Sequence, residues 1–222
     1  MAMAKGKKGI NNPARKLLVP SFAEERLFEA QGYRYIAGID EVGRGSLAGP
    51  VVAAAVILPS KIRAPWLKLV RDSKLLEPAR REFLSHHIHK TAVAIGIGSI
   101  DNTIIDTQGI IKATQLAMMM AIKQLSPSAE ALLIDFMVLP GIKLPQKGVI
   151  EGDSLCLSIA CASIVAKVSR DHLMTEMDKI YPGYGLAGHK GYGTSRHLTC
   201  LAQNGPSPIH RCSFKPVKDS VK

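Results

Sequence analysis

The 222-residue sequence has no long apolar run, only four cysteines, and fewer acidic than basic residues. A membrane-spanning helix needs roughly 18 consecutive apolar residues, and no stretch approaches that length. The first 20 residues contain five basic side chains but lack the apolar segment that a secretory signal requires. We therefore expect a cytoplasmic protein with no membrane anchor.

The cysteines are Cys156, Cys161, Cys200 and Cys212. Their spacing matches no zinc-ligand pattern, and a chain of this length does not need disulfides for stability. We expect them to be small, mostly buried apolar residues in a reducing compartment.

Lysine and arginine number 29 against 18 aspartate and glutamate, so the formal net charge is +11 and the pI is near 9.6. A surplus of this size indicates a polyanionic partner, with nucleic acid first and an anionic membrane second. A basic soluble protein without such a partner remains the alternative. The length suits one large domain, or a main domain with a small appendage.

Hydrophobic patterning divides the chain into a basic flexible arm at 1–20, an α/β domain at 21–180, and a helical, loop-rich cationic extension at 181–222. Strands come first and then alternate with helices, which predicts a mixed central sheet flanked by helices. Strands are expected at 33–39, 51–58, 91–100 (buried on both faces) and 131–136. Helices are expected at 21–31 with Ser21 as N-cap, at 77–90, at 155–170, and along a face formed by Ile110, Ala113, Ala117 and Met120.

The most informative segment is Asp40–Gly45, in which an acidic pair is followed by a Gly-Arg-Gly turn. Adjacent carboxylates repel each other, so such a pair usually has a cation nearby. An arginine between two glycines can approach a phosphate closely, because no neighbouring side chains block the backbone. The segment therefore indicates metal-assisted chemistry on a phosphodiester, with an exposed acidic turn as the alternative.

Two more carboxylates lie where a site could assemble. Asp135 ends an apolar strand, and Asp153 lies in a glycine-containing loop before a helix. In open α/β sheets, sites form at strand ends and in the loops that follow them, so these residues could join Asp40 and Glu41. Four carboxylates together would suit two Mg²⁺ or Mn²⁺ ions. For Asp153 alone, the simpler alternative is that it caps the next helix.

Further motifs, taken in order, make the chain resemble bacterial ribonuclease HII, the second type of ribonuclease H. Each segment is weak alone, but the ordered set is highly specific and covers about residues 30–218. The matching segments are Asp40–Gly45, Leu47–Val56, Asp72–Lys74, Leu132–Asp135, Gly152–Ser154, Ala162–Asp171, Tyr181–Pro182, Tyr184–Gly185, His189–Thr194, His210–Arg211 and Ser213–Phe214.

The resemblance implies a ribonuclease H-like fold with a small helical carboxy-terminal extension. It implies that the catalytic metal ligands are Asp40, Glu41, Asp135 and Asp153. The implied substrates are RNA in an RNA/DNA hybrid and a single ribonucleotide embedded in duplex DNA, cut to leave 3′-hydroxyl and 5′-phosphate ends.

The resemblance also implies which residues recognise the substrate. Gly43, Arg44 and Gly45 would sense the 2′-hydroxyl beside the scissile phosphate, and Tyr192 would pack on the same sugar. This agrees with the chemistry, because the 2′-hydroxyl distinguishes RNA from DNA. Lys74 and Lys190 are expected to bind substrate, although both could be structural, as could Lys167 and Arg170.

Two residues depart from the family pattern. Phe136 stands where glycine is expected, and Glu151 stands where lysine is expected. Glu151 would add negative charge near the metals, so activity or metal preference could differ from that of a typical member. Type III enzymes carry lysine in place of Arg44, so Arg44 favours type II.

Other interpretations remain open from sequence. One rival is a nuclease or transposase-type phosphotransferase with the same acidic fold, and another is a non-enzymatic nucleic-acid-binding protein. His86, His87 and His89 resemble metal ligands but are expected on the solvated face of a helix. Met118–Met120 are expected in a helix core. We expect a monomer.

Overall fold

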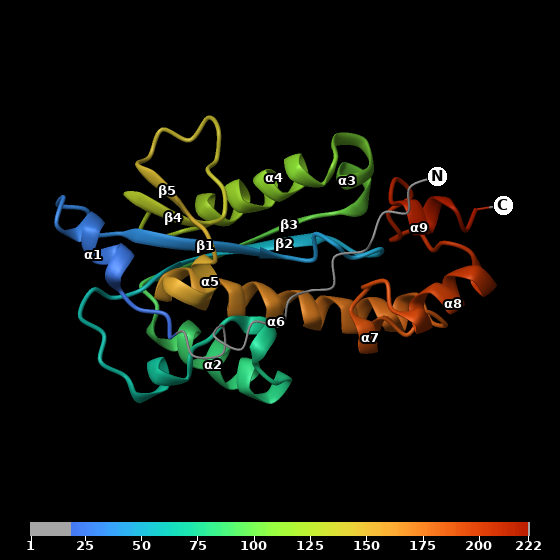
Figure 1. The fold of residues 1–222 in the computed structure, drawn as a ribbon, viewed down its shortest axis with the longest axis horizontal. Coiled ribbons are helices and arrows are strands. Elements are labelled where there is room, and N and C mark those ends of the chain that lie inside the picture. Colours follow the sequence, from blue (N-terminus) through green and yellow to red (C-terminus); the bar gives the residue numbers. More distant parts are fainter. Residues whose placement is uncertain (1–18, 222) are drawn as a thin grey trace, which may run out of the picture.

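The computed structural model describes residues 19–221, and its centre is a five-stranded mixed sheet (Figure 1). The strands lie in the order β3-β2-β1-β4-β5. β1 pairs antiparallel with β2, and β2 with β3, whereas β4 runs parallel to both β1 and β5. The strands are β1 (Ile36–Val42), β2 (Val51–Ile57), β3 (Ala94–Ile100), β4 (Ala131–Asp135) and β5 (Gln146–Val149). The predicted mixed sheet is confirmed, whereas nearly all of the predicted arm at 1–20 lies outside the described residues.

Helices cover both faces of the sheet (Figure 1). α3 and α4 lie on one face, α5 and α6 lie on the other, and α2 packs on the outer side of α6. The short helices α7 to α9 gather at one end of the molecule. The helices are α1 (Ala23–Glu29), α2 (Pro78–Thr91), α3 (Asn102–Gln108), α4 (Ile110–Lys123), α5 (Gly152–Leu155), α6 (Leu157–Ile180), α7 (Leu186–His189), α8 (Ser195–Asn204) and α9 (Lys215–Lys218), with 3₁₀ turns at Pro65–Leu69 and Ser73–Leu75.

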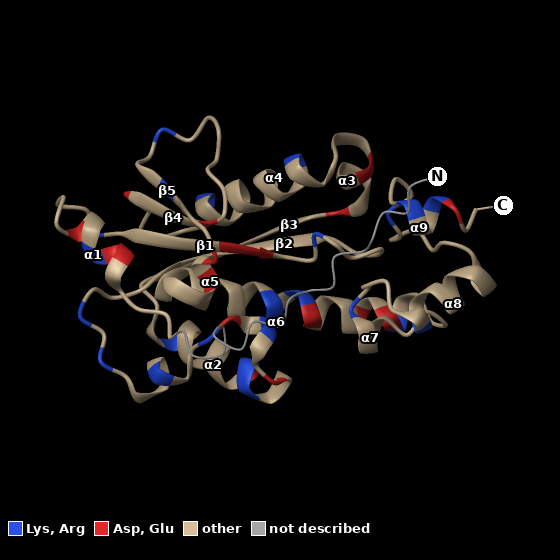
Figure 2. Ribbon diagram, in the orientation of Figure 1, with Lys and Arg blue, Asp and Glu red and all other residues tan. Residues whose placement is uncertain are grey.

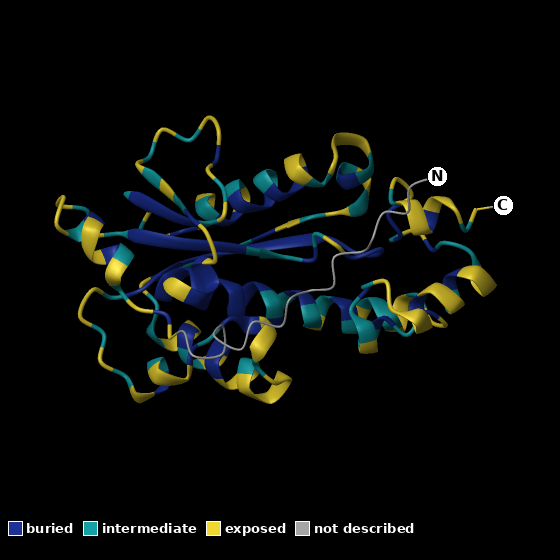
Figure 3. Cartoon of the chain, in the orientation of Figure 1, coloured by how far each residue is buried: buried dark blue, intermediate teal, exposed yellow. Residues whose placement is uncertain are grey.

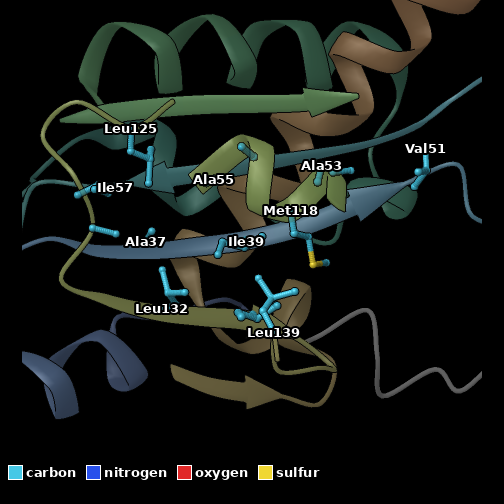
Figure 4. Close-up of a cluster of buried hydrophobic side chains, with 14 of the residues drawn as sticks. Ala37, Ile39, Val51, Ala53, Ala55, Ile57, Met118, Leu125, Leu132 and Leu139 are labelled. Atoms are coloured by element: carbon cyan, nitrogen blue, oxygen red, sulfur yellow. The ribbon is translucent and has the colours of Figure 1, made fainter. Parts of the chain in front are cut away.

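The core consists of two apolar layers, one on each face of the sheet. Ala37 and Ile39 of β1 face α4 and pack near Met118, together with Ala53 and Ala55 of β2 (Figure 4). The alternate residues of β2 face α6 instead, because successive strand side chains point to opposite faces. The inner strands and the first half of α6 are therefore the most deeply buried parts of the chain (Figure 3).

Glycines let two helices approach the sheet closely. A Cβ atom on Gly98 of β3 would lie 2.0 Å from the carbonyl oxygen of Ala117 in α4. A Cβ atom on Gly38 of β1 would lie 2.1 Å from the backbone of Ser158 in α6. Real Cβ atoms do not approach other atoms so closely, so larger residues here would push the helices away.

Several sequence-based boundaries were wrong. β1 starts at Ile36 and continues to Val42, so the acidic pair lies inside the strand rather than after it. The first helix is shorter than 21–31, and Phe22 rather than Ser21 occupies its N-cap position. The helix expected at 155–170 is split at Cys156, and its longer part, α6, extends to Ile180.

Two predictions about buried faces were also wrong. In β3 buried residues alternate with more exposed ones, because α4 covers only one side of this edge strand. In α4 the buried positions include Ala113, Ala117 and Met118, whereas Met120 is 42% exposed. The buried face therefore runs through Ala117 and Met118 rather than the Met120 side chain, and the small Ala117 lies at the close approach to Gly98.

Candidate active site

Three elements bring the four predicted carboxylates to one edge of the sheet. Asp40 and Glu41 lie near the end of β1, and Asp135 is the last residue of β4. Because β1 and β4 are parallel neighbours, their carboxyl ends meet at the same edge. Asp153 arrives there on α5, whose first residue is hydrogen-bonded to Asp135. Figure 2 shows this acidic segment in red near the end of β1.

Asp40 is the more deeply enclosed of the two acids on β1, with only 4% of its surface exposed. Its carboxylate accepts a hydrogen bond from the Glu41 backbone N–H at 2.7 Å, and the Ser163 hydroxyl of α6 bonds to it as well. Burial raises the pKa of Asp40 well above its usual value, and the negative charges of Glu41 and Asp135 raise it further. The carboxylates are therefore close enough to repel one another.

Glu41 has a cationic partner. The Arg44 guanidinium lies 3.2 Å from its carboxylate, and the Arg44 side chain is 37% exposed. Burial raises the pKa of Glu41, and Arg44 offsets part of that rise. One end of Arg44 is thus tied to the acidic cluster, while a third of its surface faces solvent.

Asp135 and Asp153 are linked through Gly152. The Gly152 N–H donates a 2.8 Å hydrogen bond to Asp135, and a Cβ atom at position 152 would lie 2.7 Å from the Ile159 side chain. Burial raises the pKa of Asp135, and the charge of Asp153 adds to the rise. Asp153 caps neither α5 nor α6, so the simpler explanation of this residue as a helix cap is wrong.

Lys74 places a positive charge within the acidic cluster. Its ammonium nitrogen lies 3.0 Å from the Asp153 carboxylate and 3.7 Å from Asp72. Desolvation disfavours the ammonium ion, but these carboxylates outweigh that effect and raise the pKa of Lys74 above its usual value. The lysine therefore stays protonated and reduces the repulsion among the acids.

Asp72 is a fifth carboxylate, and we did not predict its role from sequence. It is buried, and it caps the 3₁₀ turn by accepting a hydrogen bond from the Lys74 backbone N–H at 2.9 Å. Ser73, the next residue, shares a 2.8 Å hydrogen bond with Ser163, which also bonds to Asp40. The Asp72-Ser73-Lys74 motif could have indicated this role, because each of its three residues contacts the cluster or a residue beside it.

The carboxylates suit a hard divalent cation in their chemistry. They are oxygen donors and largely buried, and this burial, together with the charges of the neighbouring carboxylates, raises the pKa of Asp40 and of Asp135. A cation would offset both effects. As their side chains are placed, no three His, Cys, Asp or Glu residues within 19–221 are grouped closely enough to enclose an ion. In this arrangement the Lys74 ammonium and the Arg44 guanidinium neutralise part of the charge.

The Gly-Arg-Gly turn lies directly beside the carboxylates, and its two glycines serve different purposes. Gly43 has a φ of 90°, and a Cβ atom there would lie 2.2 Å from the buried Arg170 side chain. A Cβ atom on Gly45 would meet nothing within 4 Å. Gly43 is thus required by the fold, whereas Gly45 leaves open space at the surface.

A buried arginine from the carboxy-terminal segment fixes this turn. Arg211 donates one hydrogen bond to the Arg44 carbonyl at 2.8 Å and two to the Gly49 carbonyl at 3.0 and 2.8 Å. Sequence reasoning included Arg211 only as part of a motif. Nothing local in the sequence distinguishes a wholly buried arginine from a surface one, so its role appears only in the structure.

Tyr192 lies next to the turn because its backbone bridges to Ser46. Its ring is 5.6 Å from the Arg170 guanidinium and 5.8 Å from the Lys167 ammonium. It is half-buried and lines a groove of about 530 Å³ that also includes Lys167 and Lys190. Lys190 donates to the Thr175 hydroxyl at 2.8 Å, so it lies in the groove and not among the carboxylates.

A second cavity, of about 570 Å³, lies at the other end of β1. Its lining includes Tyr33, Arg34 and Lys61 and none of the predicted site residues. We place the candidate active site at the carboxylates because the titratable groups with the clearest mutual interactions lie there.

The two departures from the family pattern both have left-handed backbone conformations. Phe136 has a φ of 63° with a side chain that is 67% exposed, and Glu151 has a φ of 55°. Glycine adopts this conformation more easily than any other residue, which explains why glycine is expected at position 136. Glu151 occupies the N-cap position of α5 but does not cap it with its side chain.

The remaining predictions concern residues away from the site. His86 and His89 are exposed on α2 as expected, whereas His87 packs against Trp66, and these three form no metal site. Cys156 and Cys161 are buried as expected, but Cys200 is partly exposed and Cys212 exposed. No helix in the described part of the chain is long and apolar enough to cross a membrane.

Comparison with known proteins identifies relatives across nearly the whole chain. The sequence model of the Ribonuclease HII family matches residues 37–217. Ribonuclease HII from Dehalococcoides mccartyi strain BAV1 is 56% identical over 205 residues, which make up 92% of this chain and 97% of the relative.

Solved structures show the same fold at lower identity. Ribonuclease H2 from Pyrococcus horikoshii OT3 has a TM-score of 0.71 at 22% identity, with 83% of this chain and 96% of that chain covered. Bst-RNase HIII in complex with Mn²⁺ has a TM-score of 0.64 at 18% identity, with 94% of this chain and 72% of that chain covered. The predicted ribonuclease H-like fold is confirmed by these likenesses. With the family match and the 56% identity, they establish that the chain belongs to the ribonuclease HII family and is a ribonuclease H, a hydrolase.

Proposed function

We propose that this protein cuts the RNA strand of RNA/DNA hybrids and also cuts on the 5′ side of single ribonucleotides embedded in duplex DNA. The proposed products carry 3′-hydroxyl and 5′-phosphate ends. The observation that carries the proposal is the meeting of four carboxylates from β1, β4 and α5 directly beside a turn with open space at Gly45.

Asp40, Glu41, Asp135 and Asp153 would hold two Mg²⁺ or Mn²⁺ ions. Carboxylate oxygens are preferred ligands of both ions, and the raised pKa of Asp40 marks a site where added positive charge is stabilising. Bound ions would supply a water of lowered pKa and positive charge for the departing 3′ oxygen. Lys74 would keep Asp153 oriented through their 3.0 Å contact.

Recognition of the ribonucleotide is assigned to the surface between the turn and Tyr192. The open space above Gly45 allows a sugar to approach the backbone of Gly43, Arg44 and Gly45. The half-buried Tyr192 ring offers a flat face and a hydroxyl to the same sugar. Contacts with the 2′-hydroxyl at this place would separate RNA from DNA, because only RNA has that group.

The groove beside Tyr192 would hold the nucleic-acid backbone. Lys167 and Lys190 line it, and the extension at 181–222 contributes one wall through α7. We assign the catalytic domain to residues 21–180 and substrate binding to the extension. A monomer located in the cytoplasm would suffice for this function, because all of the proposed site residues come from one chain.

Cleavage of a labelled DNA duplex that contains one ribonucleotide tests the proposal. The reaction is run with Mg²⁺, with Mn²⁺ and with a chelator, beside an all-DNA duplex of the same sequence. A metal-dependent cut 5′ to the ribonucleotide, with the control intact, is the expected result. Binding without any cut in either metal would favour a nucleic-acid-binding protein instead, and cutting of the all-DNA control would favour a general nuclease.

A further inference from the structure

Two buried histidines connect the carboxy-terminal segment to Tyr192. His197 of α8 and His210 are 0% and 1% exposed, and their Nε2 atoms lie 3.0 Å apart. The Nδ1 atom of His197 lies 3.0 Å from the Tyr192 carbonyl oxygen. The Nδ1 atom of His210 accepts a hydrogen bond from the Ser207 backbone N–H at 2.9 Å.

These contacts allow only one arrangement of protons. The Tyr192 carbonyl can only accept, so His197 must carry its proton on Nδ1. The Ser207 backbone N–H can only donate, so Nδ1 of His210 must be bare and its proton must be on Nε2. His210 therefore donates to His197, and His197 donates to Tyr192, with both rings neutral.

The groups around the pair favour the neutral forms. Burial lowers the pKa of His210 to about 4, and it lowers the pKa of His197 as well. His189 of α7 stacks on His197 with ring centroids 4.3 Å apart, and the Tyr184 ring lies 4.9 Å from that of His210. The next residue after His210 is the buried cation Arg211, and no carboxylate is among the main groups that shift the pKa of either imidazole.

The same short segment also fixes the opposite side of the proposed sugar-binding surface. His210 bridges to Ala48, and Arg211 bonds to the Arg44 carbonyl of the Gly-Arg-Gly turn. Tyr192 bridges to Ser46 just after that turn. Two adjacent residues thus hold the two halves of this surface. Arg211 holds the turn, and His210 holds Tyr192 by way of His197.

We propose that His197 and His210 are positioning residues that hold the Tyr192 backbone, and with it the ring, against the Gly-Arg-Gly turn for ribonucleotide recognition. The proposal rests on the function proposed above. The histidines do not touch the substrate themselves, because both are buried. Their action depends on the direction of each hydrogen bond rather than on filling space.

Two substitutions of similar size separate positioning from packing. In His197→Asn the amide nitrogen can take the place of Nδ1 and still donate to Tyr192. In His197→Gln the side chain can reach His210 but offers no donor to the Tyr192 carbonyl. We expect kcat/KM on the single-ribonucleotide duplex to fall about tenfold for His197→Gln and less than about threefold for His197→Asn, as for one lost hydrogen bond. Equal losses in the two variants would overturn the proposal.

A double-mutant cycle tests whether the effect passes through Tyr192. Adding His197→Gln to Tyr192→Ala should cause no further loss, because the positioned ring is already absent. A full additional tenfold loss in that background would contradict the proposal.

A measurement on the unaltered protein covers the case in which a variant does not fold. Nitrogen-15 spectra of the histidine rings at pH 6 should show His197 protonated on Nδ1, His210 protonated on Nε2, and neither charged. The reverse tautomers or an imidazolium would overturn the proposal. An unaltered protein that fails to cut the ribonucleotide duplex would instead refute the proposed function, so the two failures can be told apart.

Discussion

At the scale of single residues, the site gathers negative charge that opposes folding. Asp40 is almost wholly buried, and its pKa is raised first by that burial and then by Glu41 and Asp135. Lys74 and Arg44 neutralise only part of the charge. The chain therefore holds a cluster that is unfavourable by itself and that the proposed cations would stabilise.

Replacing Asp40 by Asn should stabilise the metal-free protein at pH 7. The folded pKa of Asp40 lies above its unfolded value, so its contribution to stability is present at low pH and is lost as pH rises through the folded pKa. An uncharged amide at this position does not suffer this loss. In chelator we expect Tm to rise by about 2–4 °C at pH 7, the shift from roughly 1 kcal/mol, and to change less at pH 4.

Thermal unfolding across that pH range measures the effect, with the exposed Asp219→Asn as control. A lower Tm for Asp40→Asn at pH 7 would show that the cluster is not under electrostatic strain.

Two glycines of the turn should respond differently to alanine. Gly45→Ala adds a methyl group in open space, so Tm should stay within about 1 °C while cleavage of the ribonucleotide duplex falls at least about tenfold through a displaced sugar. In Gly43→Ala the new methyl group would clash with the Arg170 side chain, and the backbone φ of this position is unfavourable for alanine. We therefore expect this variant to lose about 1–3 kcal/mol of stability. Calorimetry and a cleavage assay on both variants decide this. Full activity of Gly45→Ala would remove Gly45 from the recognition surface.

At the scale of elements, the site depends on which strands are parallel. β1 and β4 end at the same edge of the sheet. The helix α6 packs closely against β1 because Gly38 has no side chain to keep the Ser158 backbone away. The cluster exists only while this packing holds. The face covered by α4 holds much of the core.

Gly98→Ala should destabilise the fold without altering the site. The new methyl group would lie 2.0 Å from the Ala117 carbonyl oxygen, so α4 must move away from the sheet. We expect the free energy of unfolding to fall by about 1–3 kcal/mol, as for other overpacked cores. Cleavage per folded molecule at about 20 °C should not change. Urea unfolding measures the loss, and Gly188→Ala is the matched control because its Cβ would meet nothing within 4 Å. Unchanged stability of Gly98→Ala would contradict the close contact.

The sequence predicted the existence of most of these elements better than their ends. Apolar runs marked β2 and β4, but β5 (Gln146–Val149) is short and polar and was missed because backbone pairing with β4 defines it. α3 was missed although Asp101 caps it, since seven residues give little periodicity. Both omissions concern elements that tertiary packing stabilises more than local preference.

The active site could be predicted from the sequence only in part. The four carboxylates stand out because acids beside apolar strands are unusual, and the structure brings all four to one edge. Asp72, His210 and Arg211 lie in matching motifs, but those motifs did not indicate what these residues do, and His197 had no motif at all. Their roles follow from contacts between residues far apart in sequence, such as the bond from Arg211 to Arg44.

At the scale of the whole molecule, positive charge dominates except near the site. The formal net charge is +11, and lysines and arginines are spread over the helices around the acidic strand end (Figure 2). This distribution would attract a polyanion from a distance, while the acidic cluster would hold the proposed cations beside it. Lys167 and Lys190 along the groove would then guide a phosphate backbone toward the carboxylates.

Binding of an RNA/DNA hybrid should therefore weaken as salt increases. Raising KCl from about 50 to 200 mM should increase Kd at least about tenfold, which corresponds to roughly two neutralised phosphates. Fluorescence anisotropy in the presence of Ca²⁺ in place of Mg²⁺ measures the binding, and Tm over the same salt range serves as the control for folding. A Kd independent of salt would contradict the electrostatic account.

The most direct test of the account compares Asp135→Asn with Asp219→Asn on the duplex containing a single ribonucleotide. Asp135 is central to the cluster through Gly152 and Asp153, whereas Asp219 is a surface residue paired with Lys215. We predict that both variants bind the duplex, and that Asp135→Asn loses cleavage at least about a thousandfold while Asp219→Asn does not, because only the former removes a ligand of the proposed ions. Cleavage by Asp135→Asn at the rate of the unaltered protein would contradict the assignment of the active site.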